Sequence, residues 1–96
     1  MKYKIREGIV YTTVCDIPLL ITTLRASEYC PPVMELSALK STFWRSFERG
    51  LNEDEFMEIL KMPPRMKEET VRVLYRRFFK EMTEKNYLIL EDHDAQ

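Results

Sequence analysis

The chain has 96 residues, of which 45% are hydrophobic and 32% are charged, and its formal net charge is -1. This length fits one domain over residues 1–96, with an ordered core over about residues 5–90. The near-neutral charge excludes a global attraction to nucleic acid or to anionic membranes. No apolar run approaches the roughly 20 residues of a membrane helix. Residues 1–4 lack the apolar core of a secretion signal, so we expect a cytoplasmic protein with reduced thiols.

β-Branched and aromatic residues gather in two runs near the N-terminus. Ile9–Val14 and Leu19–Leu24 have the composition of half-buried strands, and the connection Cys15–Pro18 contains turn-forming residues, so a β-hairpin is predicted. A hairpin alone is marginal in water, and Val33–Leu36 is the natural third strand. The polar residues 1–7 are expected to be half ordered.

Two helices are predicted from their capping residues. The first runs from Ser37, as N-cap, to Arg49, just before Gly50, which suits a left-handed helix end. The second begins after Asn52, and Glu55 three residues later completes the pattern of a capping box.

A third and longer helix is predicted from about Lys67 to Asn86, and Tyr87–Leu90 is then an extended tail or a last strand. Strands first and helices after them indicate an α+β fold. We predict a three-stranded antiparallel sheet followed by three helices that pack on one of its faces.

The third helix carries more apolar surface than a single core face needs. At helical spacing its apolar stripe comprises Val71, Leu74, Tyr75, Phe78 and Met82, with Phe79 at the edge. Arg72, Arg76 and Lys80 lie together beside this stripe. For each apolar residue alone, burial in the core is the simpler interpretation. The set, an apolar strip beside arginines, is typical of a receptor for an acidic, amphipathic peptide.

The sequence offers no pattern of catalytic or metal-binding residues. It has no glycine-rich phosphate loop, and its one histidine, His93, excludes a histidine triad or a metal trio. Cys15 and Cys30 lie too far apart for a CxxC pair; adjacent strands could bring them close enough to bridge, but small apolar fillers are the simpler interpretation. We therefore predict no enzyme activity, no cofactor and no metal.

Several stretches together resemble the PqqD-like family, also called RiPP recognition elements. The resemblance covers roughly residues 5–90. It is carried by the Gly8-Ile9-Val10 opening with its hairpin, by Met34-Glu35-Leu36-Ser37 leading to Phe43-Trp44, by Glu48-Arg49-Gly50, by the acidic Glu53-Asp54-Glu55-Phe56 and by the long last helix. It departs from the family at Ser37, where asparagine is frequent, and at Pro63-Pro64, which is unusual there.

The resemblance implies a winged-helix-like body that binds the leader of a ribosomally made precursor peptide and presents it to a modifying enzyme, often a radical SAM enzyme. It further implies that the leader adds as an antiparallel strand to the third strand and lies against the third helix. Carried onto this chain, the receiving edge is Val33, Met34, Glu35 and Leu36, and the helix wall is Arg72, Tyr75, Arg76, Phe79 and Thr83.

Two other functions fit parts of the sequence. A winged-helix DNA-binding regulator would use Arg72, Arg76, Arg77 and Lys80 against phosphates, although the net charge of -1 and the aromatic residues of the same helix disfavour it. A small dimerisation module would pair two copies through the open strand edge. A homodimer is also compatible with peptide binding.

Overall fold

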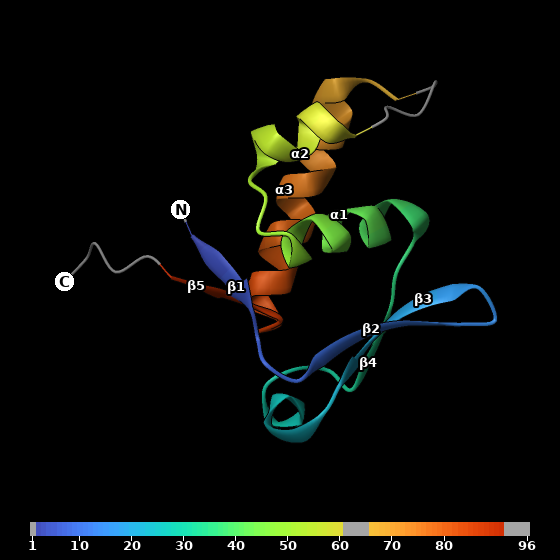
Figure 1. The fold of residues 1–96 in the computed structure, drawn as a ribbon, viewed down its shortest axis with the longest axis vertical. Helices are drawn as coiled ribbons and strands as arrows, with labels where there is room; N and C mark the ends of the chain where they lie inside the picture. Colours follow the sequence, from blue (N-terminus) through green and yellow to red (C-terminus); the bar gives the residue numbers. More distant parts are fainter. Residues whose placement is uncertain (1, 61–65, 92–96) are drawn as a thin grey trace.

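The computed structural model describes residues 2–60 and 66–91. In chain order its elements are β1 (Tyr3–Ile5), β2 (Ile9–Val14), β3 (Ile17–Thr22), the 3-10 helix η1 (Leu24–Glu28), β4 (Val33–Glu35), α1 (Ala38–Glu48), α2 (Glu53–Ile59), α3 (Glu68–Glu84) and β5 (Leu88–Leu90). Figure 1 shows α1 crossing α3, with the hairpin below them and the strands β1 and β5 to one side. The predicted α+β class is confirmed, because a three-stranded antiparallel sheet precedes three helices.

The three-stranded sheet has the order β2-β3-β4, so β3 lies in the middle. Cys15 and Asp16 both have positive φ, 52° and 66°, as the two central residues of a type I′ turn do. This turn follows the twist of the strands without any further loop residue. The predicted four-residue connection is therefore a two-residue turn, and β3 begins at Ile17.

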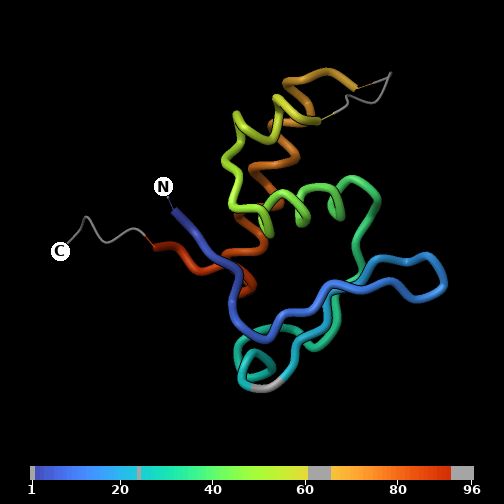
Figure 2. The backbone as a smooth tube through the Cα atoms, in the orientation of Figure 1, coloured from blue at the N-terminus to red at the C-terminus, as the bar shows by residue number. Residues whose placement is uncertain are grey.

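A second sheet pairs the two ends of the chain. β1 lies antiparallel to β5, with Tyr3 opposite Leu90 and Ile5 opposite Leu88, and Figure 2 shows the two segments side by side. The prediction that residues 1–7 are half ordered is wrong for Tyr3–Ile5, which form β1. Alternate side chains of β1, those of Tyr3 and Ile5, pack against the hydrophobic core and hold the strand in place.

The predicted helix caps are confirmed. The Lys40 N–H donates to the Ser37 hydroxyl at 3.2 Å at the start of α1. The Glu55 N–H donates to Asn52 Oδ1 at 2.8 Å, and the Asn52 N–H donates to Glu55 Oε1 at 2.9 Å, which completes the capping box of α2. Gly50 has a φ of 71° after the end of α1, a backbone conformation that glycine adopts without cost.

Aromatic rings from all three helices form the centre of the core. The rings of Phe43, Phe47, Phe56, Tyr75 and Phe78 have neighbouring centroids 5.4 to 5.9 Å apart, in edge-to-face, tilted and stacked pairs. Such ring pairs each add about 0.5–1.5 kcal/mol beyond the burial of their area. They fix one face of α3 against α1 and α2, and this leaves α3 with two flanks that face different neighbours.

Candidate functional site

The outer edge of β4 is an unpaired strand edge. One side of β4 bonds to β3, and no strand in residues 2–60 or 66–91 bonds to its other side. Because the Thr22 N–H donates to the Pro32 carbonyl at 3.0 Å, the alternation of an antiparallel pair turns the polar groups of Pro32 and Met34 toward β3. Val33 and Glu35 therefore direct their N–H and C=O groups outward. An additional strand can bond to these groups.

The four predicted edge residues play different parts. Val33 is 54% exposed and Glu35 is also exposed, whereas Met34 packs against the core. Leu36 is only 3% exposed, and its N–H donates to the Pro18 carbonyl at 2.9 Å. The outward backbone thus comes from Val33 and Glu35, while Met34 and Leu36 anchor the strand.

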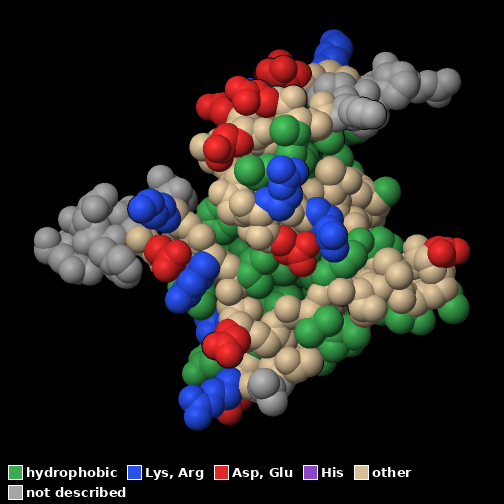
Figure 3. Space-filling view, viewed as in Figure 1, with side chains coloured by type: hydrophobic (Ala, Val, Ile, Leu, Met, Phe, Trp, Pro, Cys, Tyr) green, Lys and Arg blue, Asp and Glu red, His purple; other side chains and the backbone are tan. Residues whose placement is uncertain are grey.

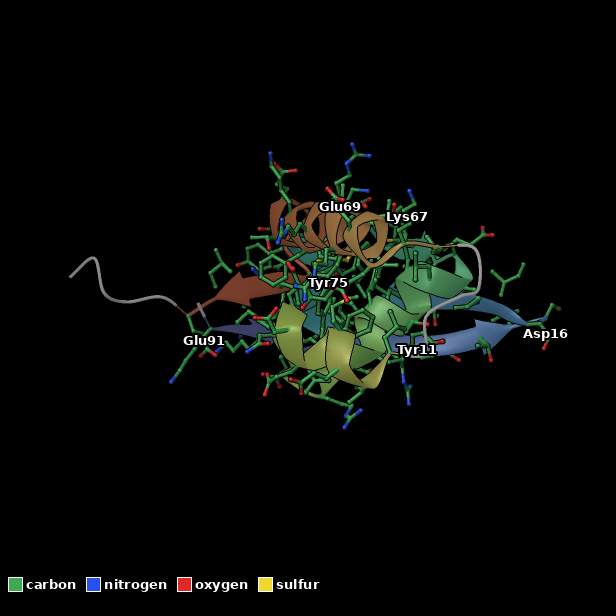
Figure 4. The ribbon with its side chains drawn as sticks, turned by 90° about the horizontal axis from the view of Figure 1, so that it is seen from above. Tyr11, Asp16, Lys67, Glu69, Tyr75 and Glu91 are labelled. Carbon is green, nitrogen blue, oxygen red and sulfur yellow. The ribbon has the colours of Figure 1, made fainter. Side chains whose placement is uncertain are left out.

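Figure 4 shows α3 standing between the β1–β5 pair on one side and the hairpin on the other, with Tyr75 pointing inward. At about 100° per residue, the helix presents a different set of side chains to each side. The β4-side flank consists of Leu74, Phe78, Glu81 and Lys85. The β1-side flank consists of Arg72, Arg76, Phe79 and Thr83, with Tyr75 at its inner border.

Contacts from α1 identify the flank that faces β4. Lys40, in the first turn of α1 shortly after β4, lies with its Nζ 3.5 Å from Glu81 Oε1 and 5.7 Å from the centroid of the Phe78 ring. Lys85 also pairs with Glu81, at 2.9 Å. The two lysines lower the pKa of Glu81, Lys85 through a hydrogen bond and Lys40 through its charge. Nothing in the sequence marks Glu81 as the partner of Lys40, because only the packing of α1 on α3 determines this contact.

The residues before β4 are tied to the end of α3. The Asn86 side-chain amide donates to the Tyr29 carbonyl at 3.0 Å, and the Tyr87 hydroxyl donates to the Pro31 carbonyl at 3.1 Å. The segment that leads into β4 is therefore held beside the residues that follow α3.

The predicted helix wall lies on the other flank and faces α2 and β1. Arg76 forms a two-pronged pair with Glu53 of α2, at 2.7 and 2.9 Å, and Arg72 bonds to Glu53 and Asp54. Phe79 packs edge to face on Tyr3, with centroids 5.4 Å apart. The contacts of this wall among the described residues are with α2 and β1, and a single surface made from the wall and the edge of β4 stays a prediction.

The remaining wall residues are used internally as well. Tyr75 is 4% exposed, and the Thr83 hydroxyl donates to the Phe79 carbonyl at 2.8 Å. The basic row expected for DNA binding is also broken, since Arg72 and Arg76 are paired with carboxylates. Red side chains gather over α2 in Figure 3, on the same end of the molecule as these arginines.

A cavity of about 350 Å³ opens on the β1-side flank. It is lined by Tyr3, Asn52, Glu53, Tyr75, Arg76 and Phe79. The hydroxyls of Tyr3 and Tyr75 share the Leu51 carbonyl, at 2.6 and 3.5 Å. Burial, together with the charge of Glu55, raises the pKa of Tyr3 to about 12, and burial also raises the pKa of Tyr75, so both phenols stay protonated at neutral pH.

The outer face of the three-stranded sheet is apolar and uncovered. The register places Val10 beside Ile21 and Ile21 beside Val33, all on the face turned away from the helices. Val14 and Ile17 continue this face toward the hairpin tip, and Val10, Val14, Ile17 and Val33 are all exposed. We call Val10, Val14, Ile17, Leu19, Ile21 and Val33 the outer sheet face.

Within residues 2–60 and 66–91, no three metal-binding side chains gather at one place. The same residues contain no helix that is long and apolar enough to span a membrane. Cys15 is exposed at the hairpin tip and Cys30 is buried beyond η1, and both are free thiols. Burial raises the pKa of the Cys30 thiol.

The fold of this chain is shared with a protein of known structure. The structure described as TbiB1 in complex with the TbiA(beta) leader peptide superposes with a TM-score of 0.69. The match covers 88% of this chain and 93% of that one, at 22% sequence identity, and it shows that the two share a fold. No family model and no curated protein sequence matches the chain.

Proposed function

We propose that this protein is a peptide-binding protein of the RiPP recognition element kind, similar to PqqD. It binds the leader of a precursor peptide as an added strand on β4 and performs no catalysis itself. The observation that carries the proposal is the pair of outward-directed backbones at Val33 and Glu35, beside a flank of α3. The likeness in fold to TbiB1, whose structure holds a leader peptide, supports it.

Strand addition takes its affinity from main-chain hydrogen bonds and its specificity from side chains. The two N–H and two C=O groups of Val33 and Glu35 bond to an antiparallel peptide strand. Alternate peptide side chains then turn toward Leu74 and toward the paired charges of Glu81 and Lys85, in place of the wall predicted from sequence. A short interface of this kind supports binding of about -8 to -10 kcal/mol, which is micromolar to sub-micromolar.

The outer sheet face supports the second half of the function, presentation of the peptide to a modifying enzyme. A strand added to β4 lies next to Val33 and extends this apolar face, because neighbouring residues across a sheet share a face. The modifying enzyme, a radical SAM enzyme by the resemblance, then docks on protein and peptide together. Because the strand enlarges the apolar area, the loaded form binds the enzyme more tightly than the empty form.

Amide hydrogen exchange tests the proposal. The probes are synthetic leader segments of short reading frames encoded beside this chain, labelled with fluorescein and screened by anisotropy. A binding segment should slow exchange at the Val33 and Glu35 amides and leave the Arg76 and Phe79 region unchanged. Slowed exchange on the β1-side flank alone would overturn the assignment to β4.

The two alternative functions are outcomes of the same experiments. DNA binding would collapse between low and physiological salt, whereas strand addition should change little. A second copy of the chain would compete for the same edge, so light scattering should show any dimer dissociating when peptide is added. The cytoplasmic location expected from the sequence belongs to this proposal.

A further inference from the structure

A second concave surface lies between β1 and η1, away from the edge of β4. It encloses about 260 Å³, and its lining includes Lys4, Arg6, Arg25, Glu7 and Tyr29. Three cations and one carboxylate give it a local charge of +2, in a chain whose net charge is -1. Figure 3 shows blue side chains along that side of the molecule, at the lower left. We call this surface the basic pocket.

The cations of the basic pocket are not neutralised by neighbours. No ion pair among the described residues involves Lys4, Arg6 or Arg25, whereas Arg72 and Arg76 are both paired with Glu53. Arg6 and Arg25 therefore differ from Arg72 and Arg76, whose charges are paired with Glu53. The cations of the basic pocket can pair with carboxylates of a partner.

Arg6 is held in a fixed position in this pocket. Its Nε donates to the Asn86 carbonyl at 2.7 Å, and its guanidinium lies over the exposed Tyr29 ring, 4.6 Å from the centroid. These two contacts leave its two terminal amino groups for other partners. The backbone beneath is fixed too, because the Gly8 carbonyl accepts bonds from both the N–H and the hydroxyl of Thr23, each at 2.8 Å.

The basic pocket lies at the end of the path that a peptide on β4 would take. A peptide strand antiparallel to β4 runs from the Glu35 end to the Val33 end and then continues past Pro31 toward Tyr29. At about 3.3 Å per residue, roughly four peptide residues cover this distance. Asn86, which holds the Tyr29 carbonyl, is exposed beside this route.

From these observations we propose that the basic pocket binds acidic side chains of the precursor peptide, in the segment that directly follows the added strand. Arginine offers carboxylates a planar pair of donors, and such charge-assisted bonds are stronger than neutral ones. The inference rests on the proposed function, because it is strand addition at β4 that delivers this segment to the pocket. It assigns a charge preference to a part of the peptide that does not touch the edge.

A first experiment tests the pocket without any leader peptide. Acetyl-tetraglutamate amide is titrated into the ¹⁵N-labelled protein at low salt, and the backbone and arginine Nε–H signals are followed. We expect chemical-shift changes centred on Arg6, Arg25 and Tyr29, and we expect none with acetyl-tetralysine amide. In the Arg25→Gln variant these changes should be at least about threefold smaller at the same peptide concentration. Shifts spread evenly over all basic residues, or none at the pocket, would overturn the site.

A second experiment uses the leader segment that protects the Val33 amide. Replacing the acidic residues within six positions after its strand by glutamine or asparagine should weaken binding about three- to tenfold, or about 0.7–1.4 kcal/mol. The same replacement before the strand should have no effect. The Arg6→Gln/Arg25→Gln protein should no longer distinguish the two peptides, and equal affinities with the wild-type protein would refute the charge preference. If no segment protects Val33, the proposed function fails, while the tetraglutamate result decides the pocket independently.

Discussion

The two flanks of α3 both carry apolar and charged side chains, but they differ in the contacts that these side chains make within the protein. On the β1-side flank, Arg72 and Arg76 are taken up by Glu53, and Phe79 lies against Tyr3. On the β4-side flank, Leu74 is half-buried, and Glu81 pairs with Lys40 from the first turn of α1. An arginine or a ring in a helical stripe therefore says little about binding until its neighbour across space is known. The predictions below test whether only the β4-side flank serves the peptide.

The largest effect is expected from blocking the edge itself. In Glu35→Pro the outward N–H is removed and a ring fills the place of the incoming strand, so peptide affinity should fall by about tenfold to a hundredfold. Because this N–H makes no bond to β3, the fold should persist. Anisotropy with the labelled leader segment measures the loss, and circular dichroism checks the fold.

Glu35→Ala is the matched control for the edge. It removes the same side chain and keeps the N–H, so it should bind the peptide as the wild type does. If the alanine variant loses as much affinity as the proline variant, the Glu35 side chain carries the binding and the main chain does not.

The next effect compares the two flanks directly. Leu74→Glu places a charge on the apolar contact proposed for the peptide, about two helical turns from Glu81, and we expect about a tenfold loss of affinity. Phe79→Ala and Arg76→Glu, on the β1-side flank, should bind within about twofold of the wild type. The opposite pattern in the same anisotropy assay would restore the helix wall predicted from the sequence.

The local features of the fold could be predicted from the sequence. The helix caps at Ser37 and Asn52 depend on residues a few positions apart, and so does the hairpin. The spacing of apolar residues in the third helix also predicted its buried stripe, which comprises Val71, Tyr75, Phe78 and Met82. β1 was missed for a physical reason. Three residues between charged neighbours form no visible strand pattern, and their partner, β5, lies at the other end of the chain.

The candidate site could be predicted only in part, because its second half depends on long-range packing. Val33 and Glu35 are placed by a strand pattern that the sequence contains. Which flank of α3 meets that strand is decided by Lys40 reaching Glu81, and a helical wheel treats both flanks alike. The acidic residues at the start of α2 did not indicate that Glu53 would form ion pairs with Arg72 and Arg76.

In a stability measurement, a truncation on the β1-side flank should have the larger effect. Phe79 packs on the rings of Tyr3 and Phe47, with centroids 5.4 and 5.8 Å away. Phe79→Ala should therefore lower the free energy of unfolding by about 2 kcal/mol, less than for a fully buried phenylalanine. Leu74→Ala removes a smaller, half-buried side chain and should cost about 1 kcal/mol. Urea denaturation gives both values, and a larger loss for Leu74→Ala would make that flank a core element rather than a binding surface.

The smallest effect is a difference in acid sensitivity between the flanks. Hydrogen bonds from Arg76 and then Arg72 lower the pKa of Glu53, and Lys85 and Lys40 lower the pKa of Glu81. A carboxylate with a lowered folded pKa stabilises the fold above its unfolded pKa, about 4.3 for glutamate, and that stabilisation is lost as pH falls through the folded value.

Melting temperatures measured from pH 6 downward should therefore fall less steeply in Glu53→Gln and Glu81→Gln than in the wild type, below about pH 4.3. The Glu53 side chain is 19% exposed and that of Glu81 is 32% exposed, so solvent screens the Glu81 pairs more. Glu53→Gln should thus flatten the curve more, and high salt should narrow the difference. A stronger effect from Glu81→Gln would mean that the lysine pairs hold the fold more firmly than the arginine pairs. In that case the β4-side flank would be too tightly engaged by its own ion pairs to yield to a peptide.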